Sequence, residues 1–143
     1  MKKSYFLLVL LPLFFFSCDE GCDKTIAPQI KNSIRARVLI LDQNGNGVLN
    51  YPVKIEFQKK WCDGSWAILV SNSGNTWPES VGYWDAVSPS YELNNKEDYI
   101  LIKYTAGTGD NIQESSEKAT YADFKSTVPT LYVEKAHTFE IIR

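Results

Sequence analysis

The sequence has 143 residues, of which 15 are lysine or arginine and 17 are aspartate or glutamate, so its formal net charge is −2. A chain of this size forms one domain with an adequate core. Its weak acidity and its lack of a basic cluster argue against nucleic-acid binding, which depends on a basic patch. Nucleic acid is therefore not an expected partner.

The first residues have the pattern of an export signal. Lys2 and Lys3 give a positive start, and Tyr5 to Phe16 carry no charge before the small residue Ser17. A positive start, an apolar stretch and a small residue are the parts of a secretory signal. A membrane-spanning helix needs about 20 apolar residues, and this stretch is shorter. We therefore expect residues 1–17 to be a cleaved signal peptide.

Cys18 refines this prediction. Ser17-Cys18 resembles the lipobox of bacterial lipoproteins, in which a small residue precedes a cysteine that becomes the lipidated N-terminus. Phe15 and Phe16 depart from the leucine and the small residue that this family usually has there. The resemblance implies acylation at Cys18 with enough chains for stable membrane attachment. It also implies a place in the bacterial cell envelope, with the outer membrane or cell surface favoured over the inner membrane.

The two other cysteines agree with export. In an oxidising compartment Cys22 and Cys62 are an even pair, which predicts a disulfide that ties the start of the chain to the domain near Trp61. The alternative is two free cysteines. Together with His137, the single histidine, they are too few for a zinc site, which needs four ligands at short paired spacings. No cofactor is expected.

The rest of the chain divides into a tether and a β-rich domain. Residues 18–33 hold few apolar side chains and predict a flexible tether, and residues 34–143 predict the domain. Period-two alternation and turn residues bound the expected strands, which are 35–41, 53–58, 66–70, 83–84, 91–93, 99–104, 131–133 and 138–142. Residues 71–80 read as a loop, and 117–125 allow either a short helix or a strand. The fold class is therefore all-β, an antiparallel β-sandwich of about seven or eight strands.

One turn resembles the opening of a calcium loop. Asp42, Asn44 and Asn46 occupy the first, third and fifth positions, and Gly47 occupies the sixth. Val53 stands where the bidentate carboxylate belongs, and the flanking segments are strands. We therefore favour a hairpin whose asparagines and glycines tolerate left-handed backbone angles, and no metal site is expected.

The same stretch carries a resemblance at the level of the fold. Alternating apolar residues from Val38 to Leu41, the Asp-x-Asn-Gly turn at Asp42, and Val53, Ile55 and Phe57 resemble the first hairpin of transthyretin-like or carboxypeptidase regulatory-like domains. The pattern is also similar to bacterial immunoglobulin-like domains of adhesins. Either resemblance implies a binding, structural or spacer module, since such domains carry no chemistry of their own.

Catalytic patterns are weak. His137 has no recognisable nucleophile beside it in the sequence, and Ser65 is not part of a Gly-x-Ser-x-Gly elbow. The aspartates of the expected loops are scattered; they are Asp63, Asp85, Asp98 and Asp110. We therefore expect a protein without enzymatic activity.

Aromatic residues are the remaining candidates for a binding site. Trp61, Trp77, Tyr83 and Trp84 lie in or beside expected loops, where flat rings with a polar handle could stack on sugars. Trp77 is the strongest candidate for exposure, whereas Trp66 opens an apolar strand and is expected in the core. The first hypothesis is a lipoprotein whose sandwich binds or spaces a partner protein of the envelope. The alternatives are a carbohydrate-binding lipoprotein and an accessory or inhibitor of an envelope hydrolase.

Overall fold

The protein is an all-β sandwich with one short helix, as the sequence predicts. The structure, a computed structural model, describes residues 26–60, 65–77, 81–126 and 132–142. In chain order the elements are β1 (Ile26–Asp42), β2 (Pro52–Lys60), β3 (Trp66–Asn75), β4 (Tyr83–Val87), β5 (Tyr91–Asn95), β6 (Tyr99–Ala106), β7 (Gln113–Thr120), α1 (Tyr121–Ser126) and β8 (Tyr132–Ile141). Within these ranges no helix is long and apolar enough to cross a membrane.

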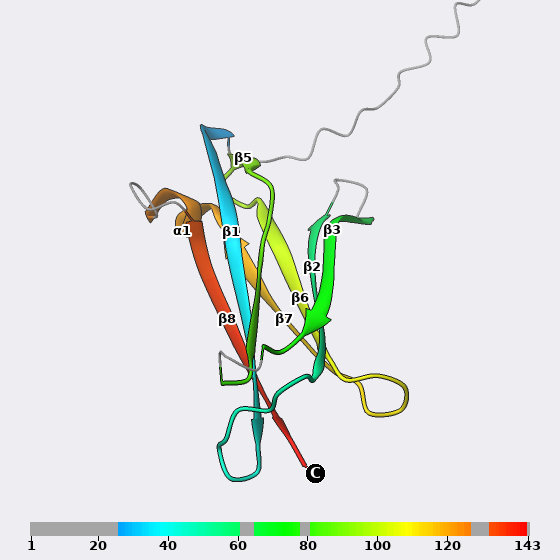
Figure 1. Cartoon of the computed structure of the whole chain (residues 1–143). Coiled ribbons are helices and arrows are strands. Elements are labelled where there is room, and N and C mark those ends of the chain that lie inside the picture. The colour runs from blue at the N-terminus through cyan, green and yellow to red at the C-terminus, as the bar shows by residue number, and fades with distance from the viewer. Residues whose placement is uncertain (1–25, 61–64, 78–80, 127–131, 143) are drawn as a thin grey trace, which may run out of the picture.

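The first sheet is built around β1 (Figure 1). Antiparallel strands β4 and β5 follow one another along β1, with Tyr83 opposite Leu39 and Tyr91 opposite Asn32. Strand β8 runs parallel to β1 over ten residue pairs, from Ser33 with Tyr132 to Asp42 with Ile141. The sandwich is thus antiparallel except for this one pair of strands.

The second sheet has the order β3-β2-β6-β7, and all its pairs are antiparallel. Side chains alternate along its strands, apart from a register shift between β2 and β3, so one row faces the first sheet and the other faces outward. The inward row of β2 and β6 is apolar and buried; it comprises Val53, Ile55, Phe57, Ile100, Ile102, Tyr104 and Ala106. These residues form the core with the inward row of β1.

Strands β1 and β2 do not form the hairpin expected from the sequence, because they belong to different sheets. The chain does reverse locally, with Leu41 bridged to Gly47 and the Val48 N–H donating to the Ile40 carbonyl at 2.8 Å. Asn50 then adopts a left-handed φ of 54°. This turn redirects the chain across the sandwich, so the prediction of a first hairpin is corrected to a crossover.

Strand β1 begins earlier than the sequence suggests. Composition predicts a tether up to Ser33, whereas β1 starts at Ile26 and pairs with β5 from there. The register shifts between Ile26 and Ile30, where Pro28 supplies no N–H to the ladder. The proline that suggests a tether therefore marks an irregular part of the strand.

Two further boundaries differ from expectation. Strand β3 continues through Ser71 to Asn75, a stretch read as loop, because its polar side chains alternate with positions that face the sandwich. The two short strands expected near the C-terminus are parts of the single strand β8.

The segment 117–125, predicted as either a short helix or a strand, contains the end of a strand and a short helix. Strand β7 ends at Thr120 and α1 begins at Tyr121. Phe124 is almost fully buried, and the Tyr121 hydroxyl donates to the Pro28 carbonyl at 2.6 Å. The helix therefore covers the end of the sandwich at which β1 begins (Figure 1).

Candidate functional site

Two adjoining hollows lie on the outer face of the second sheet. A groove of about 660 Å³ lies at the end of the sheet where β2 and β7 begin and β3 and β6 end, and a second hollow of about 410 Å³ adjoins it and shares Lys103 and Glu114. The polar side chains that line the first part are Lys54, Glu56, Ser73, Asn75, Lys103, Thr105, Thr108 and Glu114. The second part is lined by Gln58, Trp66, Leu101, Ser115 and Ser116 as well. We refer to both hollows together as the outer groove.

Strand alternation explains why polar side chains gather here. Lys54 and Glu56 alternate with the buried residues Val53, Ile55 and Phe57, so they must point to the opposite face. The register places Glu56 directly across from Lys103 of β6. The same sequence pattern that fills the core therefore lines the outer groove.

Two ion pairs lie among the side chains that line the outer groove. The Lys54 ammonium lies 2.8 Å from the Glu56 carboxylate, and the Lys103 ammonium lies 3.0 Å from the Glu114 carboxylate. Glu56 is only 7% exposed although it belongs to the outward row. A carboxylate so nearly buried needs a cation close by, and the pairs leave the groove polar but locally balanced.

An aromatic cluster lies at one end of the outer groove. The rings of Trp66 and Tyr99 are tilted against each other with centroids 6.1 Å apart. The Lys118 ammonium lies 4.3 Å from the Tyr99 centroid, and the Lys60 ammonium lies 6.0 Å from that of Trp66. Trp66 is 44% exposed, so its indole is accessible from solvent.

The expectation that Trp66 belongs to the core is therefore wrong, and a register shift is the reason. In a regular strand Trp66, Ile68 and Val70 would share one face. Val70 lies opposite Phe57 and Ile68 opposite Gln58, so Leu69 is an extra residue in β3. This bulge sends Trp66 and Ile68 outward while Val70 stays with the core.

The aromatic residues singled out from the sequence do not form one surface. Trp77 is 45% exposed, which confirms its expected exposure, and its ring lies 6.0 Å from that of Tyr83. The Arg37 guanidinium lies over the Tyr83 ring, 4.8 Å from its centroid. Trp84 is half-buried and packs against the core, where Gly74 leaves room for its indole. Trp61 lies outside the described residues.

The calcium-like turn uses its oxygens internally. One carboxylate oxygen of Asp42 accepts the N–H groups of Asn44 and Asn46, both at 2.8 Å. The Asn46 side chain donates to the other oxygen at 3.3 Å, and Gly45 adopts a φ of 80°. These are the contacts of a capped turn. Among the described residues no three histidine, cysteine or acidic side chains could together hold a metal ion.

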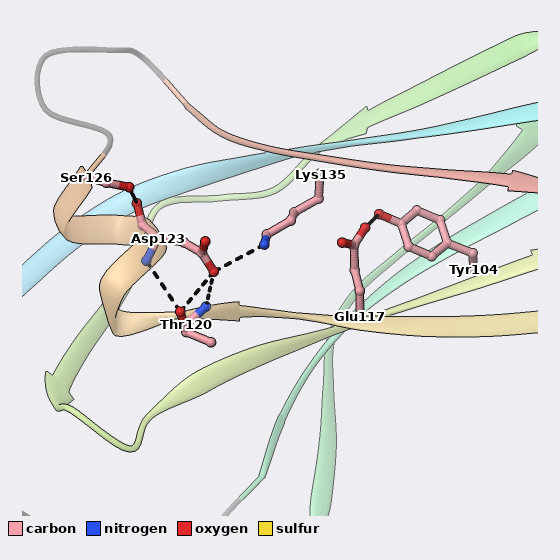
Figure 2. Close-up of polar contacts among 6 residues, drawn as sticks. All are labelled: Tyr104, Glu117, Thr120, Asp123, Ser126 and Lys135. Carbon is pink, nitrogen blue, oxygen red and sulfur yellow. Dashed lines mark hydrogen bonds and ion pairs between the residues drawn. The ribbon is translucent and has the colours of Figure 1, made fainter.

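A polar cluster lies where β7, α1 and β8 meet, and Figure 2 shows its contacts. Asp123 accepts the Thr120 N–H at 2.7 Å and hydroxyl at 2.9 Å, and lies 3.1 Å from the Lys135 ammonium. Burial opposes ionisation of Asp123, but these hydrogen bonds and the nearby ammonium outweigh it and lower its pKa. This arrangement caps α1 and fastens it to β8, so its role is structural.

A second polar contact, between Tyr104 of β6 and Glu117 of β7, lies beside this cluster (Figure 2). The Tyr104 hydroxyl donates to the Glu117 carboxylate at 2.5 Å. Burial first, and then this carboxylate, raise the pKa of Tyr104 far above its usual value. The tyrosine therefore stays protonated as a hydrogen-bond donor in the folded protein.

The residues considered for catalysis have other contacts. His137 lies between two rings, stacked 5.5 Å from Tyr104 and edge-on 4.6 Å from Phe139. Asp98 accepts hydrogen bonds from the turn at Asn95, and Asp85 lies 3.8 Å from Arg35. Asp63 lies outside the described residues. None of these contacts joins a base to a nucleophile in the part of the chain that the structure describes.

Comparison with protein-family models, curated proteins and solved structures finds no match to the chain. The predicted signal peptide and the beginning of the predicted tether lie outside the described residues, and so do Cys18, Cys22 and Cys62. Lipidation and the disulfide therefore remain predictions. Function has to be argued from the geometry of the site.

Proposed function

We propose that the chain is a carbohydrate-binding module without enzymatic activity, and that the outer groove is its binding surface. The observation that carries the proposal is the exposed indole of Trp66 at the end of a polar groove. An indole face packs against the apolar face of a sugar ring, while hydroxyl groups need hydrogen-bond partners beside it. Trp66 supplies the stacking surface, and the lysines, glutamates and serines of the groove supply hydrogen-bond partners for the hydroxyl groups.

The shape of the outer groove fits a chain better than a small enclosed ligand. Its two hollows adjoin at Lys103 and Glu114, and both lie open to solvent. A volume of about 660 Å³ falls in the range of roughly 300–1,000 Å³ that is typical of ligand sites. Several linked sugar units can therefore lie along it.

The predicted anchor would hold this module close to a membrane. Cys18 is the expected lipidated residue, and β1 begins at Ile26. A fully extended chain covers at most about 3.6 Å per residue, so the eight steps between them span at most roughly 29 Å. The proposed module would capture glycans at the surface of the envelope membrane that carries it.

Replacement of Trp66 by alanine tests the proposal. The full chain, purified in a detergent without a sugar head group, is titrated with a panel of neutral and acidic polysaccharides, with intrinsic fluorescence and affinity electrophoresis as readouts. Loss of a central aromatic contact weakens binding by about tenfold or more. We expect this loss for Trp66→Ala.

Trp77→Ala is the matched control, because Trp77 has nearly the same exposure as Trp66 but lies outside the outer groove. It should bind as the wild type does. No binding to any glycan of the panel, or an equal loss in both variants, would refute the proposal.

A second candidate function, binding of a partner protein, is favoured by strand β3. This strand is an edge of its sheet, pairing only with β2 among the described strands. It holds no charged residue and no proline, and Ile68 is 60% exposed. Natural edge strands usually carry charges or prolines that prevent pairing with other chains. An uncharged edge of ten residues therefore suits the addition of a partner strand.

Photo-crosslinking in living cells tests this candidate. A photoreactive residue at position 68 should give one defined adduct with an envelope protein. The same residue at Ile142, which is 92% exposed and outside β3, should not. Adducts that are absent or identical at both positions would exclude β3 as the docking strand.

A further inference from the structure

The outer face of the second sheet carries more positive charge than the rest of the chain. By register, four lysines and two glutamates point outward from its strands; they are Lys54, Lys60, Lys103, Lys118, Glu56 and Glu114. The whole chain has a net charge of −2. Both glutamates are already paired with lysines of the groove. The excess positive charge therefore belongs to Lys60 and Lys118.

These two lysines are grouped with the aromatic residues. Their ammonium groups lie 6.0 Å from the Trp66 ring and 4.3 Å from the Tyr99 ring. Neither makes an ion pair with another described residue within 4.0 Å. A ligand that stacks on the indole would thus have two cations beside it.

Two acids, Asp98 and Glu97, lie near these lysines in the described structure without forming an ion pair with them. Asp98 turns its carboxylate to the backbone and side-chain amides of Asn95 at 3.3 Å and 3.2 Å. Glu97 is exposed and lines a small hollow beside Lys60. Around this aromatic cluster three lysines, Lys59, Lys60 and Lys118, therefore stand against the two carboxylates of Glu97 and Asp98.

We infer that the glycan bound by the outer groove is acidic, specifically a polymer of uronic acids. A uronic ring has an apolar face for Trp66 and a carboxylate at its edge for Lys60 and Lys118. A neutral ring would stack equally well but would leave both ammonium groups without a counter-charge. This inference rests on the proposed carbohydrate binding and adds the class of sugar to it.

A pair of ligands that differ only in charge tests the inference. Polygalacturonate and its fully methyl-esterified form share one backbone, but the ester has no carboxylate; alginate and hyaluronate extend the acidic set. An exposed ion pair is worth up to about 1 kcal/mol, or roughly fivefold in affinity. We expect the preferred acidic polymer to bind about tenfold more tightly than its ester at low salt. This preference should fade at 1 M salt, where the Debye length is about 3 Å.

Variants assign the effect to the two lysines. Lys60→Gln with Lys118→Gln should lower affinity for the acidic polymer about tenfold and leave affinity for the ester unchanged. The control, Lys31→Gln with Lys125→Gln, removes the same charge from exposed positions outside the outer groove and should bind as wild type.

The outcomes separate the two proposals. Equal binding of acid and ester, or full binding by the Lys60 and Lys118 variant, would overturn the inference of an acidic ligand while carbohydrate binding stands. Failure of every glycan to bind would overturn both.

Discussion

At the scale of a single residue, Thr76 links the end of β3 to the segment between β1 and β2. It is fully buried, and its hydroxyl donates to the Val48 carbonyl at 2.6 Å and accepts the Tyr51 N–H at 2.9 Å. Its backbone exchanges two further hydrogen bonds, accepting from Asn50 and donating to the Tyr51 carbonyl, both at 3.0 Å. The crossover from β1 to β2 is therefore held against the end of β3 by one threonine.

Thr76→Val keeps the shape of the side chain and removes the hydroxyl. It leaves the buried Val48 carbonyl and the partly buried Tyr51 N–H without their partner, which costs about 2 kcal/mol of unfolding free energy. Urea denaturation of wild type and variant measures the loss. Thr138→Val, at an exposed position of β8, should change stability by no more than about 0.5 kcal/mol. Equal losses in both variants would contradict the role of the Thr76 hydroxyl.

Single residues also show which parts of the candidate site could not be predicted from the sequence. Alternation in β2 is regular, so the outward direction of Lys54 can be read from the buried rows beside it. The direction of Trp66 cannot, because it depends on the extra residue Leu69, which only the pairing of β3 with β2 defines. Trp66 and Tyr99 are also far apart in sequence and meet only through the sheet. Exposure of an aromatic residue signals such a site, but the sequence does not show exposure.

At the scale of elements, α1 is a helix of six residues that depends on its cap. Thr120 and Asp123 form a capping box. The Thr120 N–H donates to the Asp123 carboxylate, and the Asp123 N–H donates to the Thr120 hydroxyl oxygen. Lys135 then ties this carboxylate to β8. The helix has too few residues to be stable without these contacts and the burial of its aromatic side chains.

Asp123→Ala should lower the unfolding free energy by about 1 kcal/mol at pH 7. The pKa of Asp123 is lower in the folded protein than in the unfolded chain, so the ionised form stabilises the fold. This contribution is complete above about pH 4 and is lost as the pH falls through the lower, folded value. Unfolding curves of wild type and variant should therefore converge as the pH falls below the unfolded value of about 4. Asp110→Ala, in an exposed loop, serves as control, and a constant difference at all pH values would contradict the assignment.

The crossing of two loops also belongs to this scale. Gly82 has a φ of 86°, and a Cβ there would lie 2.6 Å from the Cα of Gly47 and from the N of Val48. Gly109 has a φ of 62°, but a Cβ there would meet nothing within 4 Å. Both glycines occupy left-handed backbone, and only Gly82 lies against another segment.

Gly82→Ala should therefore cost roughly 3 kcal/mol, and Gly109→Ala only about 1 kcal/mol, the strain of a left-handed alanine. Thermal and urea denaturation of the two variants measure the difference. Similar losses would mean that backbone strain alone is at work and that the two loops can separate.

Elements with one apolar row are predictable from the sequence, whereas those at the rim of the sandwich are not. Strands β2 and β6 have buried alternating residues and lie where the sequence places them. Strand β7 faces inward with Gln113, Ser115 and Glu117, because it is the edge of its sheet, so its pattern lacks an apolar row. The sequence therefore predicts the fold class but leaves the rim strands and the sheet to which each strand belongs undetermined.

At the scale of the whole molecule, the N-terminal sequence predicts attachment to a membrane through a lipid on Cys18. Cys18→Ala should leave an unprocessed precursor in the bacterial host, detected as a larger band without incorporated radiolabelled palmitate. Wild-type protein should be cleaved and labelled. Normal cleavage of the variant would contradict lipidation at Cys18.

The predicted disulfide is tested in the same cells. Thiols of Cys22 and Cys62 should resist alkylation until a reductant is added, because an exported pair is oxidised. Ready alkylation in freshly exported, unreduced protein would contradict the pairing.

The parallel arrangement of β1 and β8 has a mechanical consequence. Their ten residue pairs run from Ser33 and Tyr132 to Asp42 and Ile141, so β1 starts at one end of the sandwich and β8 finishes at the other. A pull on the start of β1 and an opposing pull on the end of β8 would slide these strands past each other. All the hydrogen bonds between them would then carry load at once, in shear, instead of opening one after another as in a zipper. If the predicted N-terminal anchor is loaded against the C-terminal end of β8, this pairing would resist the pull in shear.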